Sequence, residues 1–189
     1  MSLTRTSRLS CVVLASLLVT ASLAEAKELA GVKMPDTLNV GGKSLVLNGV
    51  GLRKKAIFKV YVGGLYLESV SKDAPGIVAA DTPKAIRMQF LRSIGKDKMI
   101  EAFREGFEAN ARERMVTQKA NIDKFLALTA DVKDGDAWTF AYVPGKGTVI
   151  SHGEKEVGTF EGKDFADALF SIWLGPKPPS EDLKKGMLG

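Results

Sequence analysis

Two residue types that commonly carry out chemistry occur once each in this chain of 189 residues, as Cys11 and His152. A zinc site or an iron–sulfur cluster built from several Cys and His side chains is therefore excluded within one chain. A catalytic triad would need His152, which lies between Ser151 and Gly153 in an expected hairpin turn, without a G-x-S-x-G motif. We interpret His152 as an exposed turn residue and expect neither a metal nor a cofactor.

Two other stretches have the composition of ligand-binding loops but not their spacing. The stretch 144–148 contains Gly-Lys-Gly, yet its spacing differs from that of a phosphate-binding loop and a strand is expected after it. Asp131, Asp134 and Asp136 lack the remaining positions of a calcium-binding loop. We interpret the first stretch as a turn and the second as a polar loop.

Arg53 is the strongest candidate for binding chemistry. It follows Gly49-Val50-Gly51-Leu52 and precedes a strongly apolar strand, so its side chain is a candidate to point into a cleft. A guanidinium in that position would hold a carboxylate or a phenolate through paired N–H donors. The alternative is a surface arginine at the start of the basic run 53–55, which composition alone favours.

The first half of the chain has the apolar patterns of strands. A short strand is predicted over Lys43–Leu47, a central strand with two apolar faces over Ala56–Glu68, and a half-buried strand over Ala85–Leu91. The pair Gly63-Gly64 in the central strand indicates a bulge or the close approach of another backbone. These strands are the elements that must position Arg53.

After Leu91 the spacing of the apolar residues changes from that of strands to that of helices. Apolar residues recur every three or four positions from Asp97 to Met115, which predicts an amphipathic helix with Asp97 as its N-cap. The remaining elements are predicted as a helix over Asn121–Ala130, strands over Ala137–Val143, Gly147–Ser151 and Glu156–Phe160, a helix over Lys163–Leu174 that ends at Gly175, and a short helix over Glu181–Met187.

This order of elements predicts an α+β fold with a mainly antiparallel sheet and helices along one face. Phe103, Phe107, Phe125 and Trp173 are interpreted as core packing, because the phenylalanines occur at helical spacing and the tryptophan lies near a helix end. A cleft between sheet and helices is the expected place for a ligand.

Composition and charge narrow the possible partners. The chain is 45% apolar and 26% charged, which is ordinary for a globular domain and excludes disordered, collagen-like and disulfide-stapled classes. Its formal charge of +5 is spread along the chain, without a basic stripe interleaved with stacking aromatics. We therefore expect no nucleic-acid partner; the charge mildly favours small anionic ligands or a membrane surface.

Residues 1–26 have the pattern of a secretory signal peptide. Two arginines precede the apolar run Cys11–Val19, and Ala24-Glu25-Ala26 fits the small-x-small cleavage rule. The apolar run is too short for an ordinary membrane-spanning helix, and an uncleaved N-terminal anchor is the alternative. Cleavage after Ala26 would leave residues 27–189 as one secreted domain without cysteine.

Four stretches resemble the chalcone isomerase family, and most of all its bacterial, secreted chalcone isomerase-like branch. They are Asn48–Arg53, Lys59–Glu68, Phe90–Arg92 with the following helix, and Phe165–Gly175, which together span nearly all of residues 27–189. The resemblance implies an open-faced β-sandwich, in which a layer of helices covers a large antiparallel sheet with a cleft between them. It also implies a periplasmic location.

The resemblance implies two kinds of activity. Plant enzymes of this family cyclise chalcones to flavanones without a cofactor, by adding a phenolate across an enone, and other members bind fatty acids without catalysis. In both kinds an arginine at the head of the central strand holds the anion, and it matches Arg53. The helix lysine and the late Thr or Ser of the enzymes match Lys98 and Ser171.

Other positions depart from the enzymes. Tyr61 stands where they have a threonine, and Gly95 and Ala102 stand where they have a tyrosine and an asparagine. Loss of one donor that stabilises the developing oxyanion typically costs about 3–4 kcal/mol.

Three hypotheses follow, in order of preference. The first is a non-catalytic binder of a small amphipathic or aromatic anion such as a fatty acid, with Arg53, Tyr61, Lys98 and Ser171 as ligand-binding residues. The second is a cofactor-independent isomerase, an intramolecular lyase on a chalcone-like enone, in which Arg53, Tyr61 and Lys98 are catalytic. The third is a structural or interaction module whose cleft is filled by side chains.

Overall fold

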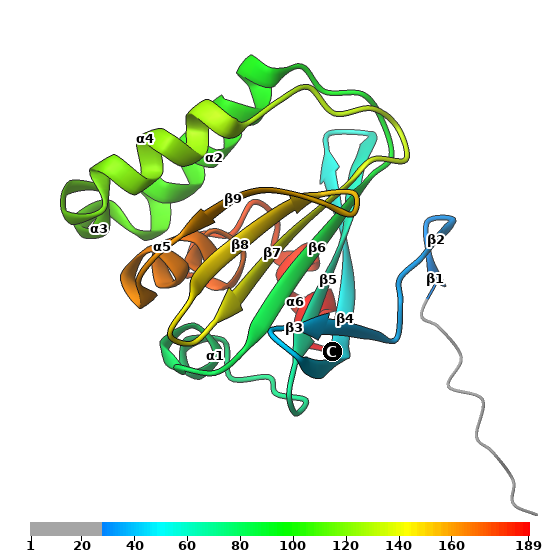
Figure 1. Cartoon of the computed structure of the whole chain (residues 1–189). Coiled ribbons are helices and arrows are strands. Elements are labelled where there is room, and N and C mark those ends of the chain that lie inside the picture. Colours follow the sequence, from blue (N-terminus) through cyan, green and yellow to red (C-terminus); the bar gives the residue numbers. More distant parts are fainter. Residues whose placement is uncertain (1–27) are drawn as a thin grey trace, which may run out of the picture.

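The computed structural model describes residues 28–189, and the expected signal peptide lies outside this range. A curled antiparallel sheet of seven strands forms one layer and helices cover one of its faces (Figure 1). The predicted α+β class, with a layer of helices on a large antiparallel sheet, is confirmed. No helix within residues 28–189 is both long enough and apolar enough to span a bilayer.

The seven strands follow one another in space in the same order as in the chain. Their bounds are β3 (Thr37–Val40), β4 (Lys43–Lys55), β5 (Phe58–Leu67), β6 (Lys84–Phe90), β7 (Ala137–Val143), β8 (Gly147–His152) and β9 (Lys155–Phe160). A separate two-stranded ribbon, β1 (Glu28–Leu29) and β2 (Val32–Lys33), precedes them. Every pairing in the large sheet is antiparallel, so each strand continues through a turn or a longer connection into its neighbour.

Six helices complete the described chain. They are α1 (Ala74–Ala79), α2 (Lys96–Asn110), α3 (Arg112–Thr117), α4 (Lys119–Leu128), α5 (Lys163–Leu174) and α6 (Glu181–Leu188). The main core lies between the sheet and this helix layer, with α5 buried from Phe165 to Leu174. Phe103, Phe107 and Phe125 are buried there in edge-to-face contacts, as their helical spacing predicted.

The central strand is predicted correctly in its buried part but not at its start. Residues 61–67 of β5 are buried on both faces, whereas Ala56 and Ile57 form the turn of the β4–β5 hairpin and are exposed. Of the two alternatives at Gly63-Gly64, the bulge is wrong, because pairing continues without a register shift through both residues, and the atoms nearest to a Cβ there belong to side chains rather than to another backbone. The register shifts in this hairpin instead lie near Asn48 and Val60.

The strand predicted to end at Leu47 continues to Lys55. The second half of this strand lacks an alternating hydrophobic pattern because Gly49 and Gly51 have no side chains. Both glycines lie on the face of β4 that packs against α6. A Cβ on Gly51 would lie 2.2 Å from the carbonyl oxygen of Leu183, and one on Gly49 would lie 2.3 Å from that of Gly186. These glycines therefore allow the α6 backbone to lie directly on β4.

The helix predicted over Asp97–Met115 divides at Ala111 into α2 and α3. The Asn110 side chain at this break donates to the carbonyl oxygen of Lys177 at 2.9 Å and accepts from its N–H at 2.8 Å. The Asp97 cap is also wrong: Gly95 is the N-cap, and the Asp131 carboxylate accepts from the Lys96 N–H at 2.7 Å. Both differences come from partners distant in sequence.

His152 is not an exposed turn residue. It ends β8 opposite Trp138, with its ring 5.5 Å from the indole ring and its Nε2 3.2 Å from an Asp136 carboxylate oxygen. The side chain is half-buried, and its strand pairing rather than a turn determines its position.

Candidate functional site

Arg53 reaches the space between sheet and helices because of strand alternation. Gly49, Gly51 and Arg53 occupy alternate positions of β4, and alternate residues of a strand point to the same face. Helix α6 covers the two glycines, and Arg53, two residues farther along the strand, lines a cavity next to it. The guanidinium donates a hydrogen bond to the carbonyl oxygen of Lys54.

Tyr61 lies opposite Arg53 in the β4–β5 register. The register shift beside this pair leaves Val60 as an extra residue of β5, and Val60 and Tyr61 both line the cavity. The Tyr61 hydroxyl oxygen accepts a hydrogen bond of 3.1 Å from the indole Nε1 of Trp173. Burial raises the pKa of Tyr61 to about 12, although the Trp173 hydrogen bond and the Arg53 charge act in the opposite direction. Tyr61 is therefore a neutral phenol near neutral pH.

The cavity has a volume of about 770 Å³ and lies between the β4–β6 end of the sheet and helices α2 and α5. This volume is within the range of about 300–1,000 Å³ that is usual for small-molecule sites. Its larger apolar and aromatic lining residues are Phe58, Val60, Tyr61, Met88, Phe90, Ile94, Met99, Phe103, Ile172 and Trp173. A cleft filled by side chains such as Phe103, Phe107 and Trp173 would support the third hypothesis; Phe103 and Trp173 form part of the cavity wall.

The charged lining of the cavity is predominantly basic. It comprises Arg53, Lys55, Arg92, Lys98, Lys177 and one acidic side chain, Glu105. The Arg92 guanidinium lies 4.7 Å from the centre of the Phe58 ring, so positive charge and apolar surface are in contact. An apolar chamber with this excess of positive charge suits a molecule with an apolar body and an anionic group.

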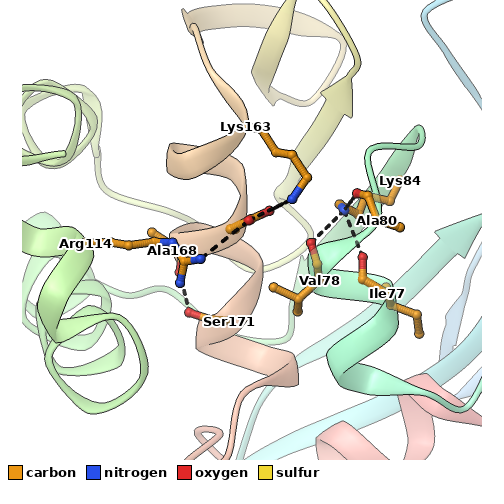
Figure 2. Close-up of polar contacts among 9 residues, drawn as sticks. Ile77, Val78, Ala80, Lys84, Arg114, Lys163, Ala168 and Ser171 are labelled. Carbon is orange, nitrogen blue, oxygen red and sulfur yellow. Dashed lines mark hydrogen bonds and ion pairs between the residues drawn. The ribbon is translucent and has the colours of Figure 1, made fainter. Parts of the chain in front are cut away.

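Ser171 is the predicted site residue that does not line the cavity. Its hydroxyl is buried and donates to the carbonyl oxygen of Ala168 at 2.7 Å (Figure 2). Asp167, one turn earlier on α5, accepts from Lys163 at 2.8 Å and lies 3.6 Å from Arg114 of α3. Through Asp167 this face of α5 contacts Arg114 of α3, whereas the cavity is lined from α5 by Ile172 and Trp173.

The structure thus brings Arg53, Tyr61 and Lys98 to one cavity. Gly95 and Ala102, where the resemblance implies polar residues in the enzymes, also lie on its wall. Neither of their side chains can form a hydrogen bond.

Three of the cavity residues that sequence reasoning missed are polar or charged and bear on binding: Trp173, Arg92 and Lys177. Trp173 was interpreted as packing, although a buried indole N–H normally needs a polar partner and Tyr61 provides one. Arg92 and Lys177 come from connections, next to Phe90 and after α5, where periodicity carries no signal. Within residues 28–189, no three His, Cys, Asp or Glu side chains gather as a metal site would require.

Comparisons with known proteins concern the fold and the family of this chain. Among solved structures, the chain is similar to a fatty-acid binding protein from Arabidopsis thaliana, with a TM-score of 0.68 and 16% sequence identity over 87% of this chain and 96% of that chain. At that identity the likeness concerns the fold. A search of curated proteins gave no significant match. The family profile described as chalcone isomerase-like matches residues 26–189, and the chain therefore belongs to the chalcone isomerase-like family.

Proposed function

We propose that this protein binds a small amphipathic anion, such as a fatty acid, without transforming it. The observation that carries the proposal is the cavity of about 770 Å³, which combines an apolar chamber with five basic side chains and one acidic one. The apolar lining favours an alkyl or aromatic body through burial, and the basic side chains favour a carboxylate. The fold shared with a plant fatty-acid binding protein supports the same assignment.

In the proposed complex, the Arg53 guanidinium and the Tyr61 hydroxyl hold the carboxylate. Trp173 already donates to the Tyr61 oxygen, so the hydroxyl proton of Tyr61 is available to a ligand. Lys98 is exposed on α2 and supplies further positive charge at the cavity. The ligand body would lie against Met88, Phe90 and the other apolar residues of the chamber.

Binding is preferred to isomerisation because of the polar groups that the cavity wall contains. Gly95 and Ala102 offer no side-chain donor, and the Ser171 hydroxyl is bonded to Ala168 away from the cavity. Acceleration of phenolate addition needs donors directed at the enone oxygen where charge develops. We therefore expect a hydroxychalcone to bind without turnover above the buffer background.

The test is calorimetric titration of the delipidated protein with dodecanoate. Arg53→Met should weaken binding by about tenfold or more, because hydrogen bonds to charged groups contribute about 1.5–3 kcal/mol. Arg104→Met is the matched control, since Arg104 is exposed on α2 outside the cavity. Equal affinity of Arg53→Met and the wild type for dodecanoate would overturn the assignment of Arg53 as the residue that binds the carboxylate. Dodecylamine binding as tight as dodecanoate binding would overturn anion selectivity, and hydroxychalcone turnover abolished by Arg53→Met would favour the isomerase.

We also propose that residues 1–26 direct export to the periplasm and are removed after Ala26. The arginines, the apolar run and the Ala-Glu-Ala site support this proposal. Intact-mass measurement of the protein from its host should give a chain that begins at Lys27. A retained N-terminus would indicate the uncleaved anchor.

A further inference from the structure

The β4–β5 hairpin extends beyond the rest of the sheet. Pairing of β5 with β6 begins at Tyr61, so the residues before it have β4 as their strand partner but not β6. In Figure 1 this hairpin is drawn in cyan at the upper end of the sheet. We call residues 54–59 the hairpin tip.

The hairpin tip presents apolar side chains to solvent at its outermost point. Ile57 is 87% exposed and Phe58 is 54% exposed. Ala56 has a φ of 53°, in the left-handed region where such turns favour Gly or Asn. The turn therefore carries apolar residues at positions where ordinary turn chemistry favours small polar ones or glycine.

The charged residues of the hairpin tip itself are all basic. Lys54, Lys55 and Lys59 flank the turn and are exposed, and Arg92 lies over the Phe58 ring. No Asp or Glu occurs in the sequence between Asp36 and Glu68, nor between Asp81 and Asp97. These two acid-free stretches contain the hairpin and the connection that holds Arg92.

The hairpin tip adjoins the cavity. Phe58 and Lys55 line the cavity while belonging to the tip, and Arg92 lines it from the other side of the Phe58 ring. A binding partner that contacts the hairpin tip would therefore also contact the rim of the cavity.

We propose that the hairpin tip docks on the surface of an anionic phospholipid bilayer, with Ile57 and Phe58 inserted between headgroups and the three lysines with Arg92 on their phosphates. Two exposed apolar side chains within a ring of cations match a layered surface, in which anionic headgroups lie above hydrocarbon. The role of this docking rests on the proposed function: an amphipathic anion would pass between bilayer and cavity at the same rim.

The test measures partitioning of ligand-free protein to vesicles by co-sedimentation. Vesicles of phosphatidylcholine with an equal share of phosphatidylglycerol should bind the protein, and pure phosphatidylcholine vesicles should bind it far less. Lys54→Gln with Lys59→Gln should lower the partition coefficient about thirtyfold, since each surface lysine contributes about 1 kcal/mol. Ile57→Ser should lower it about tenfold.

Matched controls separate this local surface from overall charge and hydrophobicity. Lys72→Gln with Lys146→Gln removes the same charge from exposed residues at the opposite end of the strands. Val116→Ser removes an apolar side chain of α3 that is 80% exposed. Both controls should partition like the wild type. Equal losses in the tip variants and the controls would overturn the proposal, as would absence of binding to the anionic vesicles.

The failures of the two proposals are distinguishable. Lys54, Lys59 and Ile57 do not line the cavity, so their variants should bind dodecanoate in solution like the wild type. A protein that binds dodecanoate but not anionic vesicles would overturn docking and leave the ligand assignment intact. A protein that binds vesicles through the tip but not dodecanoate would support docking and overturn the proposed ligand.

Discussion

The hydroxyl oxygen of Tyr61 accepts a hydrogen bond of 3.1 Å from the indole N–H of Trp173, and both side chains are buried. The bond joins β5 to α5 across the wall of the cavity. Because an indole N–H only donates, Tyr61 keeps its own proton for a ligand oxygen. One hydroxyl thus links the sheet to the helix layer and takes part in the proposed carboxylate site.

Replacement of Tyr61 by Phe should lower the free energy of unfolding by about 1–3 kcal/mol, because the buried indole N–H of Trp173 loses its acceptor. Urea unfolding measures this loss. In a Trp173→Phe background the donor is already absent, so the same replacement should cost less. An equal cost in both backgrounds would contradict the assigned role of the hydrogen bond.

Gly51→Ala should destabilise the protein by about 3 kcal/mol or more, because the new Cβ would lie 2.2 Å from a backbone oxygen of α6 that cannot rotate away. Thermal and urea unfolding report the loss. Gly95→Ala is the control, since its Cβ would meet no atom nearer than 3.9 Å. We expect that control to cost less than about 1 kcal/mol, the usual size of a change at an N-cap. Similar losses in the two variants would contradict close packing of α6 on β4.

Lys84 should make the free energy of unfolding depend on pH in the alkaline range. Its buried ammonium donates to the carbonyl oxygens of Ile77, Val78 and Ala80 at 2.8, 3.0 and 2.6 Å (Figure 2). Burial lowers the pKa of Lys84 from 10.5 to about 8. Between these values the unfolded chain binds a proton that the folded chain lacks, so the free energy of unfolding should rise with pH.

At higher pH, the change of the free energy of unfolding with pH has the opposite sign. Burial raises the pKa values of Tyr61, Tyr66 and Tyr142 from 10.0 to about 12. These tyrosines ionise first in the unfolded chain, so the free energy of unfolding should fall as pH rises through this interval. Urea unfolding across the alkaline range measures both limbs. In Lys84→Met the rise should be absent while the fall persists, and an unchanged rise would assign the effect to another group.

Much of the fold follows from local patterns in the sequence. Residues 61–67 and the helix Lys163–Leu174 were predicted correctly, because their burial produces continuous apolar runs or helical spacing. The strand through Gly49 and Gly51 was partly missed, because close packing by α6 requires residues without a side chain. The break at Asn110 was missed because its hydrogen bonds go to Lys177, distant in sequence.

Sequence patterns are sufficient to identify the family, most of the strands and helices, and Arg53, Tyr61 and Lys98 as candidates at one site. Tertiary structure alone decided which of the candidates share a cavity. Ser171 has a suitable hydroxyl, but the packing of α5 directs it to Ala168. Trp173 and Arg92 reach the cavity through contacts that no periodicity encodes. The periodicity of apolar residues assigns a side chain to one face of a strand or helix. Whether a cavity remains beside that face depends on how elements distant in sequence pack against it.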